Sequence, residues 1–169
     1  MNIVFLDVDG VLAYNKYRNK ETADIDVKKV KMLKDICDKG SANVVIISSW
    51  RDAPKMYQIL TNILSFNGIN VLDDAPNIEC EYEGDTSYGI AMTTIEDLPH
   101  LKLKFGTGRA AEVQKWIEEH STDNFVILDD EDWDWADYGY DEHWIQPVWF
   151  GDGGLQKEHI VKAIEILRK

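Results

Sequence analysis

The stretch Ile3-Val4-Phe5-Leu6-Asp7-Val8-Asp9-Gly10-Val11-Leu12 decides the fold of this chain. Its leading apolar residues, 3–6, form a short run that is typical of a buried strand. Asp7 and Asp9 lie two positions apart, so on an extended backbone their side chains point to the same face. Gly10 then permits a sharp turn that can expose backbone N–H groups. The stretch therefore predicts a strand that brings two carboxylates together at its carboxyl end.

Two neighbouring carboxylates repel one another unless a cation or a proton neutralises one of them. Mg²⁺ prefers oxygen ligands and is often bound beside phosphates, and open α/β sheets bind ligands at the carboxyl ends of their strands. However, Asp and Gly are also common in ordinary polar turns. The stretch alone is therefore compatible with a turn that has no catalytic role, and the rest of the chain decides between these interpretations.

The composition indicates one globular domain over residues 1–169, long enough for a substantial core. No apolar stretch approaches the roughly 20 residues of a membrane span, and the N-terminus lacks a signal-like pattern, so we expect a cytoplasmic protein without a membrane partner. Cys37 lies on the apolar face of an expected helix and should be a buried thiol. The net charge of −13 opposes broad polyanion binding but permits a local phosphate site that carries a cation.

Apolar patterns predict strands and helices that alternate along the chain. Strands are expected over 3–6, 43–47, 69–72, 124–128 and 145–150, the last at a sheet edge because it contains Pro147. Helices are expected over 27–39, capped by Asp26 and closed by Gly40, between 52 and 68, from 106 onward and over 155–169. Such alternation predicts right-handed βαβ units and a doubly wound α/β fold with a parallel sheet.

Residues 73–104 interrupt this alternation with acidic and turn residues and no helical period. We expect a β-hairpin flap or another small insertion over the site. The segment is too short for a large cap domain, so the site should be open.

Polar residues follow two of the expected strands directly. Ser48 and Ser49 come after strand 43–47, and Asp129 and Asp130 come after strand 124–128. Because parallel strands present their carboxyl ends at one edge, these side chains should lie near Asp7. A serine here could also be a simple helix cap, and an acidic run is usually a solvated loop.

The order of these stretches resembles that of the haloacid dehalogenase (HAD) superfamily of phosphohydrolases. Residues 7–12 resemble its motif I, the serines motif II, Arg109 the basic motif III and Asp129-Asp130 the acidic motif IV. The stretch Ser48-Ser49-Trp50-Arg51 is most similar to small capless HAD domains of nucleic-acid repair, of the polynucleotide 3′-phosphatase type. The resemblance implies a Rossmann-like sheet, capless or with a small insertion, and Mg²⁺-dependent phosphomonoester hydrolysis.

The resemblance also implies catalytic roles. Asp7 would be the nucleophile that forms an aspartyl-phosphate, and Asp9 the general acid and base. Ser48 would bind the phosphoryl group, with Ser49 as the alternative. Arg109 would do the same where the family usually has Lys, and Lys102 and Lys104 are nearby alternatives for that role.

Metal and substrate contacts follow from the same resemblance. Mg²⁺ would be held by Asp7, the backbone carbonyl of Asp9 and Asp130, with Asp129 in support, and Asp134 matches a further acidic residue of motif IV. Substrate contacts are expected from Ser49, Arg51 and Gly10. For Arg51 the alternative is an ion pair.

Two further groups of residues bear on the substrate. Trp133, Trp135, Tyr138, Tyr140, Trp144 and Trp149 could stack against a base or could form a lid over the sheet edge. Lys16, Arg18 and Lys20 could contact an anion or simply be solvated. We expect the substrate to be a nucleotide or a nucleic-acid terminal phosphate. The alternatives are a phosphorylated small metabolite, a non-enzymatic phosphate-binding module and, least favoured, a receiver domain.

Overall fold

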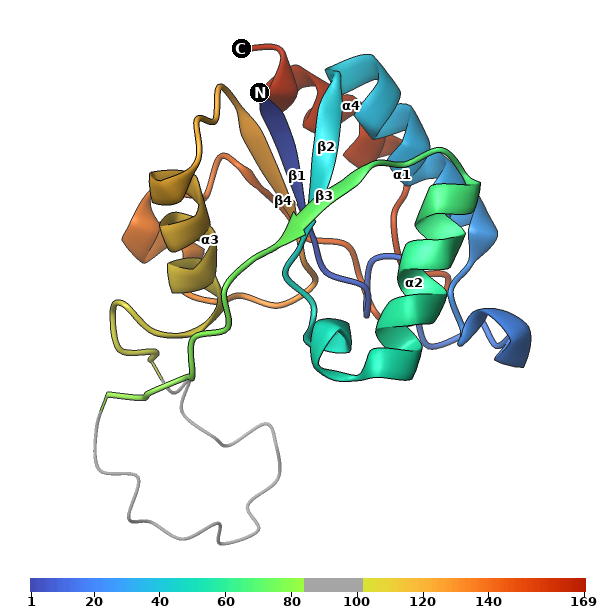
Figure 1. Ribbon diagram of the computed structural model, residues 1–169, viewed down its shortest axis with the longest axis horizontal. Coiled ribbons are helices and arrows are strands. Elements are labelled where there is room, and N and C mark those ends of the chain that lie inside the picture. Colours follow the sequence, from blue (N-terminus) through green and yellow to red (C-terminus); the bar gives the residue numbers. More distant parts are fainter. Residues whose placement is uncertain (84–101) are drawn as a thin grey trace, which may run out of the picture.

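The computed structural model describes residues 1–83 and 102–169, which form a five-stranded parallel sheet flanked by helices (Figure 1). The strands are β1 (Asn2–Leu6), β2 (Ala42–Ile46), β3 (Val71–Asp74), β4 (Phe125–Leu128) and β5 (Trp144–Ile145). Their order is β3-β2-β1-β4-β5, and every pair is parallel. Because β1 is central and the chain moves outward from it in both directions, the doubly wound α/β fold is confirmed.

Helices cover both faces of the sheet. The helices are α1 (Val27–Gly40), α2 (Pro54–Phe66), α3 (Gly108–Glu119) and α4 (Lys157–Leu167), with short 3₁₀ turns at Lys20–Thr22, Ser49–Asp52 and Trp135–Tyr138. The period of two along β1 sends alternate side chains to opposite faces. Val4 and Leu6 pack in the core under α1, α2 and α4, whereas Ile3 and Phe5 pack with residues of α3. Figure 1 shows α3 apart from the other three helices.

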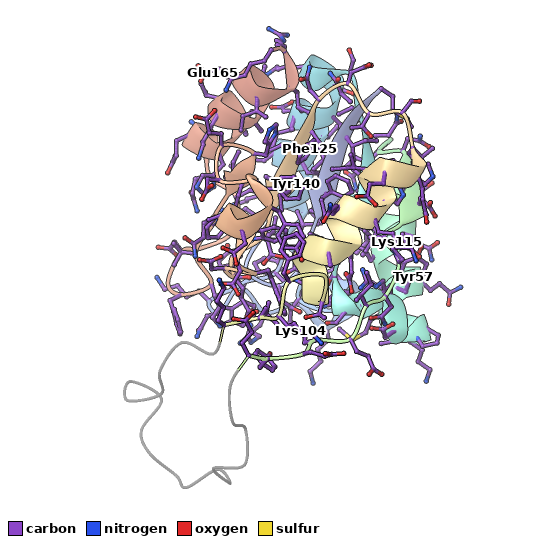
Figure 2. The ribbon with its side chains drawn as sticks, turned by 90° about the vertical axis from the view of Figure 1, so that its left-hand side faces the viewer. Tyr57, Lys104, Lys115, Phe125, Tyr140 and Glu165 are labelled. Atoms are coloured by element: carbon purple, nitrogen blue, oxygen red, sulfur yellow. The ribbon has the colours of Figure 1, made fainter. Side chains whose placement is uncertain are left out.

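The α3 face is rich in aromatic contacts. Phe5 on β1 meets Trp116 of α3 edge to face, with ring centroids 5.5 Å apart. Figure 2 shows Phe125 of β4 close to Tyr140, and these two rings meet in the same way at 5.2 Å. Such edge-to-face pairs add to the stabilisation from burial, so this aromatic layer fixes α3 against the strands that carry the site.

The start of α1 agrees with the sequence, but its end does not. Asp26 caps the helix, since its side chain accepts a hydrogen bond from the N–H of Lys28 at 2.9 Å. Gly40 was expected to close the helix, yet it is the last helical residue, and Ser41 adopts the left-handed conformation with φ of 50°. A side chain at Gly40 would overlap Leu167 of α4. The glycine is therefore needed for close helix packing.

The edge strand β3 begins and ends two residues later than expected. It includes Asp73 and Asp74, which are atypical strand residues. Their carboxylates accept hydrogen bonds from Trp116 Nε1 at 3.1 Å and from the Tyr57 hydroxyl at 2.8 Å. Side-chain partners thus make an acidic edge strand stable where local propensity predicted a loop.

The edge strand β5 is much shorter than the expected 145–150. It pairs with β4 through Trp144 and Ile145 alone. Pro147 follows, and because proline has no N–H to donate, the ladder does not continue. The expected edge position is confirmed, and the segment after it is free to turn toward the site.

Residues 81–83 and 102–104, both within the expected insertion 73–104, pair with one another. Glu83 donates its N–H to the carbonyl of Lys102 at 2.9 Å, and Lys104 donates to Glu81 at 2.8 Å. These antiparallel contacts fit the base of a hairpin, and residues 84–101 between them lie outside the described residues.

Cys37 is a buried free thiol, as expected. Within residues 1–83 and 102–169, no helix has the length and apolar character needed to cross a bilayer.

Candidate active site

Three carboxylates meet at the carboxyl edge of the sheet. Asp7 follows β1, while Asp129 and Asp130 follow β4, and each offers one oxygen within 4.8 Å of the others. The two strands are neighbours with Leu6 opposite Leu128, so Asp7 and Asp129 continue the same register. The sheet topology therefore gathers acids that are more than a hundred residues apart in the sequence.

Arg109 lies in the first turn of α3 and faces this cluster. Its Nη1 is 2.7 Å from Asp129 Oδ2 and 3.4 Å from Asp7 Oδ2. The ring of Trp133 covers the guanidinium at 4.6 Å, a cation–π contact. Two carboxylates and one aromatic ring thus fix the position of this cation.

The two lysines considered as alternatives lie elsewhere. Lys102 pairs with Asp137 at 3.0 Å and Lys104 with Glu81 at 2.7 Å, all with solvent-accessible side chains. Of the three basic residues considered, the structure brings only Arg109 to the carboxylates.

The cluster holds more negative charge than Arg109 can balance. Burial raises the pKa of Asp7, although Arg109 and a hydrogen bond from Ser48 act in the opposite direction. Burial and the negative charge of Asp7 together raise the pKa of Asp129 to about 8 and that of Asp130 to about 6. Such shifts mean that the ionised forms lack compensation. A hard divalent cation with oxygen ligands would supply it, so the donor set fits Mg²⁺.

The two serines after β2 occupy different environments. Ser48 is fully buried and contacts the Asp7 carboxylate, and its Oγ also accepts a hydrogen bond from the Trp50 N–H at 3.4 Å. Ser49 is exposed and lines the cavity above the carboxylates. β2 ends at Ile46, one residue earlier than expected. Ser48 contacts the Asp7 carboxylate, whereas Ser49 lines the cavity that a substrate would occupy.

Asp9 projects into solvent and is oriented by a residue that sequence reasoning missed. Its Oδ2 accepts a hydrogen bond at 2.9 Å from Nε1 of Trp50, whose side chain is otherwise buried. Trp50 belongs to the Ser-Ser-Trp-Arg stretch that carried the family resemblance. The signal in the sequence was a tryptophan directly after the two serines, because its indole N–H can donate a hydrogen bond to a carboxylate of the site.

Gly10 is required by the packing of the site. Its φ is 75°, and a side chain here would overlap the carboxyl group of Asp130. The N–H of Gly10 itself donates to the carbonyl of Ala13 at 2.7 Å and is not open to a ligand. A contact between Gly10 and the substrate stays a prediction, and the glycine is needed here because Asp130 approaches its backbone closely.

A cavity of about 580 Å³ opens over the carboxylates. It is lined by Asp7, Asp9, Ser49, Arg109, Asp130, Glu131, Trp133, Trp149 and Phe150. Of the two roles considered for Trp135, stacking against a base is excluded, because the side chain is fully buried and donates from Nε1 to the carbonyl of Glu131 at 3.1 Å. Trp144 likewise donates inward, to the Asp129 carbonyl at 2.8 Å.

The family described as "HAD domain in Swiss Army Knife RNA repair proteins" matches residues 3–160, which include every residue of this site. The chain belongs to this family of HAD domains. Comparison with curated proteins and with solved structures gave no match. The resemblance to HAD domains of nucleic-acid repair is therefore confirmed.

Arg51 of this HAD domain is held in an ion pair. Its Nη2 lies 2.7 Å from Glu112 of α3, and the two side chains are only 9% and 5% exposed. Glu112 also accepts a hydrogen bond from the N–H of Ile78 at 3.0 Å. Arg51 does not line the cavity over Asp7 but an adjoining one of about 200 Å³, which shares Ser49, Arg109 and Trp133 with it. The sequence signal for this ion pair was Glu112, an acid on the buried face of α3, and it was missed.

Asp134 of the HAD domain, matched to motif IV, has a further contact. Its Oδ2 accepts a hydrogen bond from the N–H of Leu103 at 2.8 Å, and its own backbone is left-handed with φ of 56°. The loop after β4 is thereby tied to the end of the 73–104 segment.

One of the three basic residues that could contact an anion, Lys16, forms an ion pair with Asp152 at 3.1 Å.

Proposed function

We propose that this HAD domain hydrolyses a phosphomonoester at the end of a nucleotide or nucleic acid, with Asp7 as nucleophile and Mg²⁺ as cofactor. One observation carries the proposal: three carboxylates with raised pKa values cluster beside Arg109, and two of them, Asp7 and Asp130, line the cavity together with it. Membership of a family of HAD domains from RNA repair proteins supports the choice of substrate.

The proposed metal ligands are Asp7, Asp130 and the backbone carbonyl of Asp9, with Asp129 in support. Mg²⁺ bound there would neutralise charge on the phosphoryl oxygens and on the carboxylate that attacks. Asp129 already shares its charge with Arg109 at 2.7 Å, which fits a supporting role better than a direct one.

In the proposed first step, a carboxylate oxygen of Asp7 attacks phosphorus and the bond to the leaving oxygen breaks. Asp9 gives its proton to that oxygen, and the product alcohol departs. A water then attacks the aspartyl-phosphate while Asp9 takes a proton from it. Inorganic phosphate leaves, and the Asp7 carboxylate is restored. The indole of Trp50 orients Asp9 for both transfers.

Other residues stabilise the charge that moves during these steps. Arg109 faces Asp7 and would contact the phosphoryl oxygens, whose charge has to be balanced in the transition state. Ser48 supports the Asp7 carboxylate from below, and Ser49 offers a hydroxyl from the cavity wall. Arg51 is engaged with Glu112, so its contribution would be to hold the loop that carries the serines.

A substrate screen tests the proposal. Purified protein should release phosphate from 3′- or 5′-phosphorylated oligonucleotides or from mononucleotides, and chelation by EDTA should stop the reaction reversibly. Sugar phosphates of similar charge serve as matched competitors. Faster hydrolysis of a sugar phosphate than of every nucleotide and oligonucleotide would show a metabolite phosphatase. Absence of any hydrolysis with Mg²⁺ would favour a phosphate-binding module.

A further inference from the structure

The cavity over Asp7 has an aromatic wall formed by consecutive residues after β5. Trp149 and Phe150 line it together with the catalytic carboxylates. Phe150 is 72% exposed, so its ring is open to solvent at the rim of this cavity. An exposed aromatic ring at the rim of a cavity is the kind of surface that binds a ligand.

The turn that carries these rings is fixed by several backbone contacts. The carbonyl of Val148 accepts a hydrogen bond from Gly154 at 2.8 Å, and that of Trp149 accepts one from Asn15 at 2.9 Å. A side chain at Gly153 would overlap the Val148 carbonyl, so only glycine permits this turn. The turn therefore holds both rings in place before a ligand binds. Binding would then cost little conformational entropy, because this segment is already ordered.

The charges of the cavity favour a neutral contact over an ionic one. Its described lining contains Asp7, Asp9, Asp130 and Glu131 against Arg109, which already pairs with two carboxylates. A phosphodiester chain would meet repulsion here, and the net charge of −13 adds to it. Stacking against a base needs no cation and is tolerant of sequence.

Phe150 is better placed for stacking than the other rings near the site. One face of Trp133 is covered by the guanidinium of Arg109 at 4.6 Å. Trp135 is fully buried and can offer no surface. Among the described residues of the cavity wall, Phe150 therefore has the free ring, with Trp149 beside it.

We propose that Phe150 and Trp149 form the stacking surface for the terminal nucleobase while the terminal phosphate lies at Asp7. This inference rests on the proposed phosphatase function and narrows its substrate to ends that carry a base. Recognition would be confined to the last nucleotide, because the described lining offers no row of cations for a longer chain.

The test compares two 3′-phosphorylated oligonucleotides, one with a normal terminal nucleotide and one with an abasic terminal residue. For Phe150→Ala, KM for the normal end should rise about 5- to 100-fold. KM and kcat for the abasic end should stay within about twofold, and Phe150→Tyr should restore most of the binding. Val161→Ala, 58% exposed on α4, and Phe66→Ala, 92% exposed on α2, are the matched controls. Neither control should distinguish the two substrates.

Salt provides a second measurement. If the contact is stacking, KM for the normal end should change at most about threefold between about 50 and about 200 mM salt, as for a single phosphate contact. An equal loss on both substrates in Phe150→Ala, or a steep salt dependence that this variant leaves intact, would overturn the stacking proposal while the phosphatase assignment survives. If the wild-type protein hydrolyses neither these substrates nor the matching 5′-phosphorylated oligonucleotides and mononucleotides, both proposals fail together.

Discussion

Two arginines flank the start of α3, and they illustrate balanced and unbalanced charge. Arg51 and Glu112 form a one-to-one pair with little exposure to solvent and with further hydrogen bonds to the backbone. Arg109 faces three carboxylates, and the pKa values of all three are raised. A balanced pair holds structure together, whereas a surplus of acids leaves a demand for a cation. The excess of carboxylates over cations distinguishes the candidate active site from the structural ion pair better than the number of charged residues does.

Replacing the proposed nucleophile tests the unbalanced region with the largest expected effect. Asp7→Asn should lower phosphatase activity by at least about a thousandfold, because an amide oxygen cannot form the acyl-phosphate. The fold should remain, as judged by circular dichroism and melting temperature. Asp35→Asn, a surface change on α1, is the control and should retain full activity. More than about a tenth of wild-type turnover in Asp7→Asn would contradict the assignment.

Breaking the ion pair between Arg51 and Glu112 should lower the stability of the fold. Glu112→Gln leaves the buried Arg51 without its counter-charge, which should cost about 3–5 kcal/mol of unfolding free energy in denaturant titrations. The double change Arg51→Met with Glu112→Leu removes both charges and should recover most of the loss. A single variant as stable as wild type would show that the pair contributes little.

Magnesium should stabilise the unbalanced region in a pH-dependent way. The carboxylates of Asp129 and Asp130 have folded-state pKa values of about 8 and about 6, above the ordinary 3.8. The folded protein therefore binds more protons than the unfolded chain between those values, so metal-free stability should fall as pH rises from about 4 to about 8. Mg²⁺ should raise the melting temperature more at about pH 8 than at about pH 5.

Asp130→Asn sharpens this measurement. The amide removes one repelling charge, so the metal-free melting temperature at about pH 8 should rise and the response to Mg²⁺ should shrink. Asp35→Asn should keep the wild-type response, with NaCl at equal ionic strength as the salt control. An unchanged Mg²⁺ response in Asp130→Asn would argue against this residue as a ligand.

The smallest effect is expected from the indole that orients Asp9. Trp50→Phe keeps an aromatic ring in the core but removes the donor 2.9 Å from the carboxylate. We expect kcat to fall about 3- to 10-fold with KM nearly unchanged, as one orienting hydrogen bond is lost. A shift in the pH profile of kcat should accompany the loss. A fall in kcat that merely follows lower thermal stability would instead indicate a packing role.

Much of the fold could be predicted because its signals are local. The apolar run before Asp7 and the alternation of strands and helices needed only neighbouring residues to be recognised. The same holds for Asp129 and Asp130, which follow an apolar strand directly. The prediction failed where partners distant in the sequence decide the local structure. Asp73 and Asp74 were predicted to lie in a loop, but hydrogen bonds from Trp116 and Tyr57 stabilise them in a strand.

The sequence by itself determined the parallel α/β sheet, the family resemblance and the acids at the strand ends, because periodicity and strand order bring those residues to one edge. Only the tertiary structure decided that Arg51 is bound by Glu112, that Trp135 is buried and that Phe150 is exposed at the cavity rim. These outcomes depend on contacts between elements far apart in the chain. Burial and charge balance are properties of such contacts, and residue type alone does not fix them.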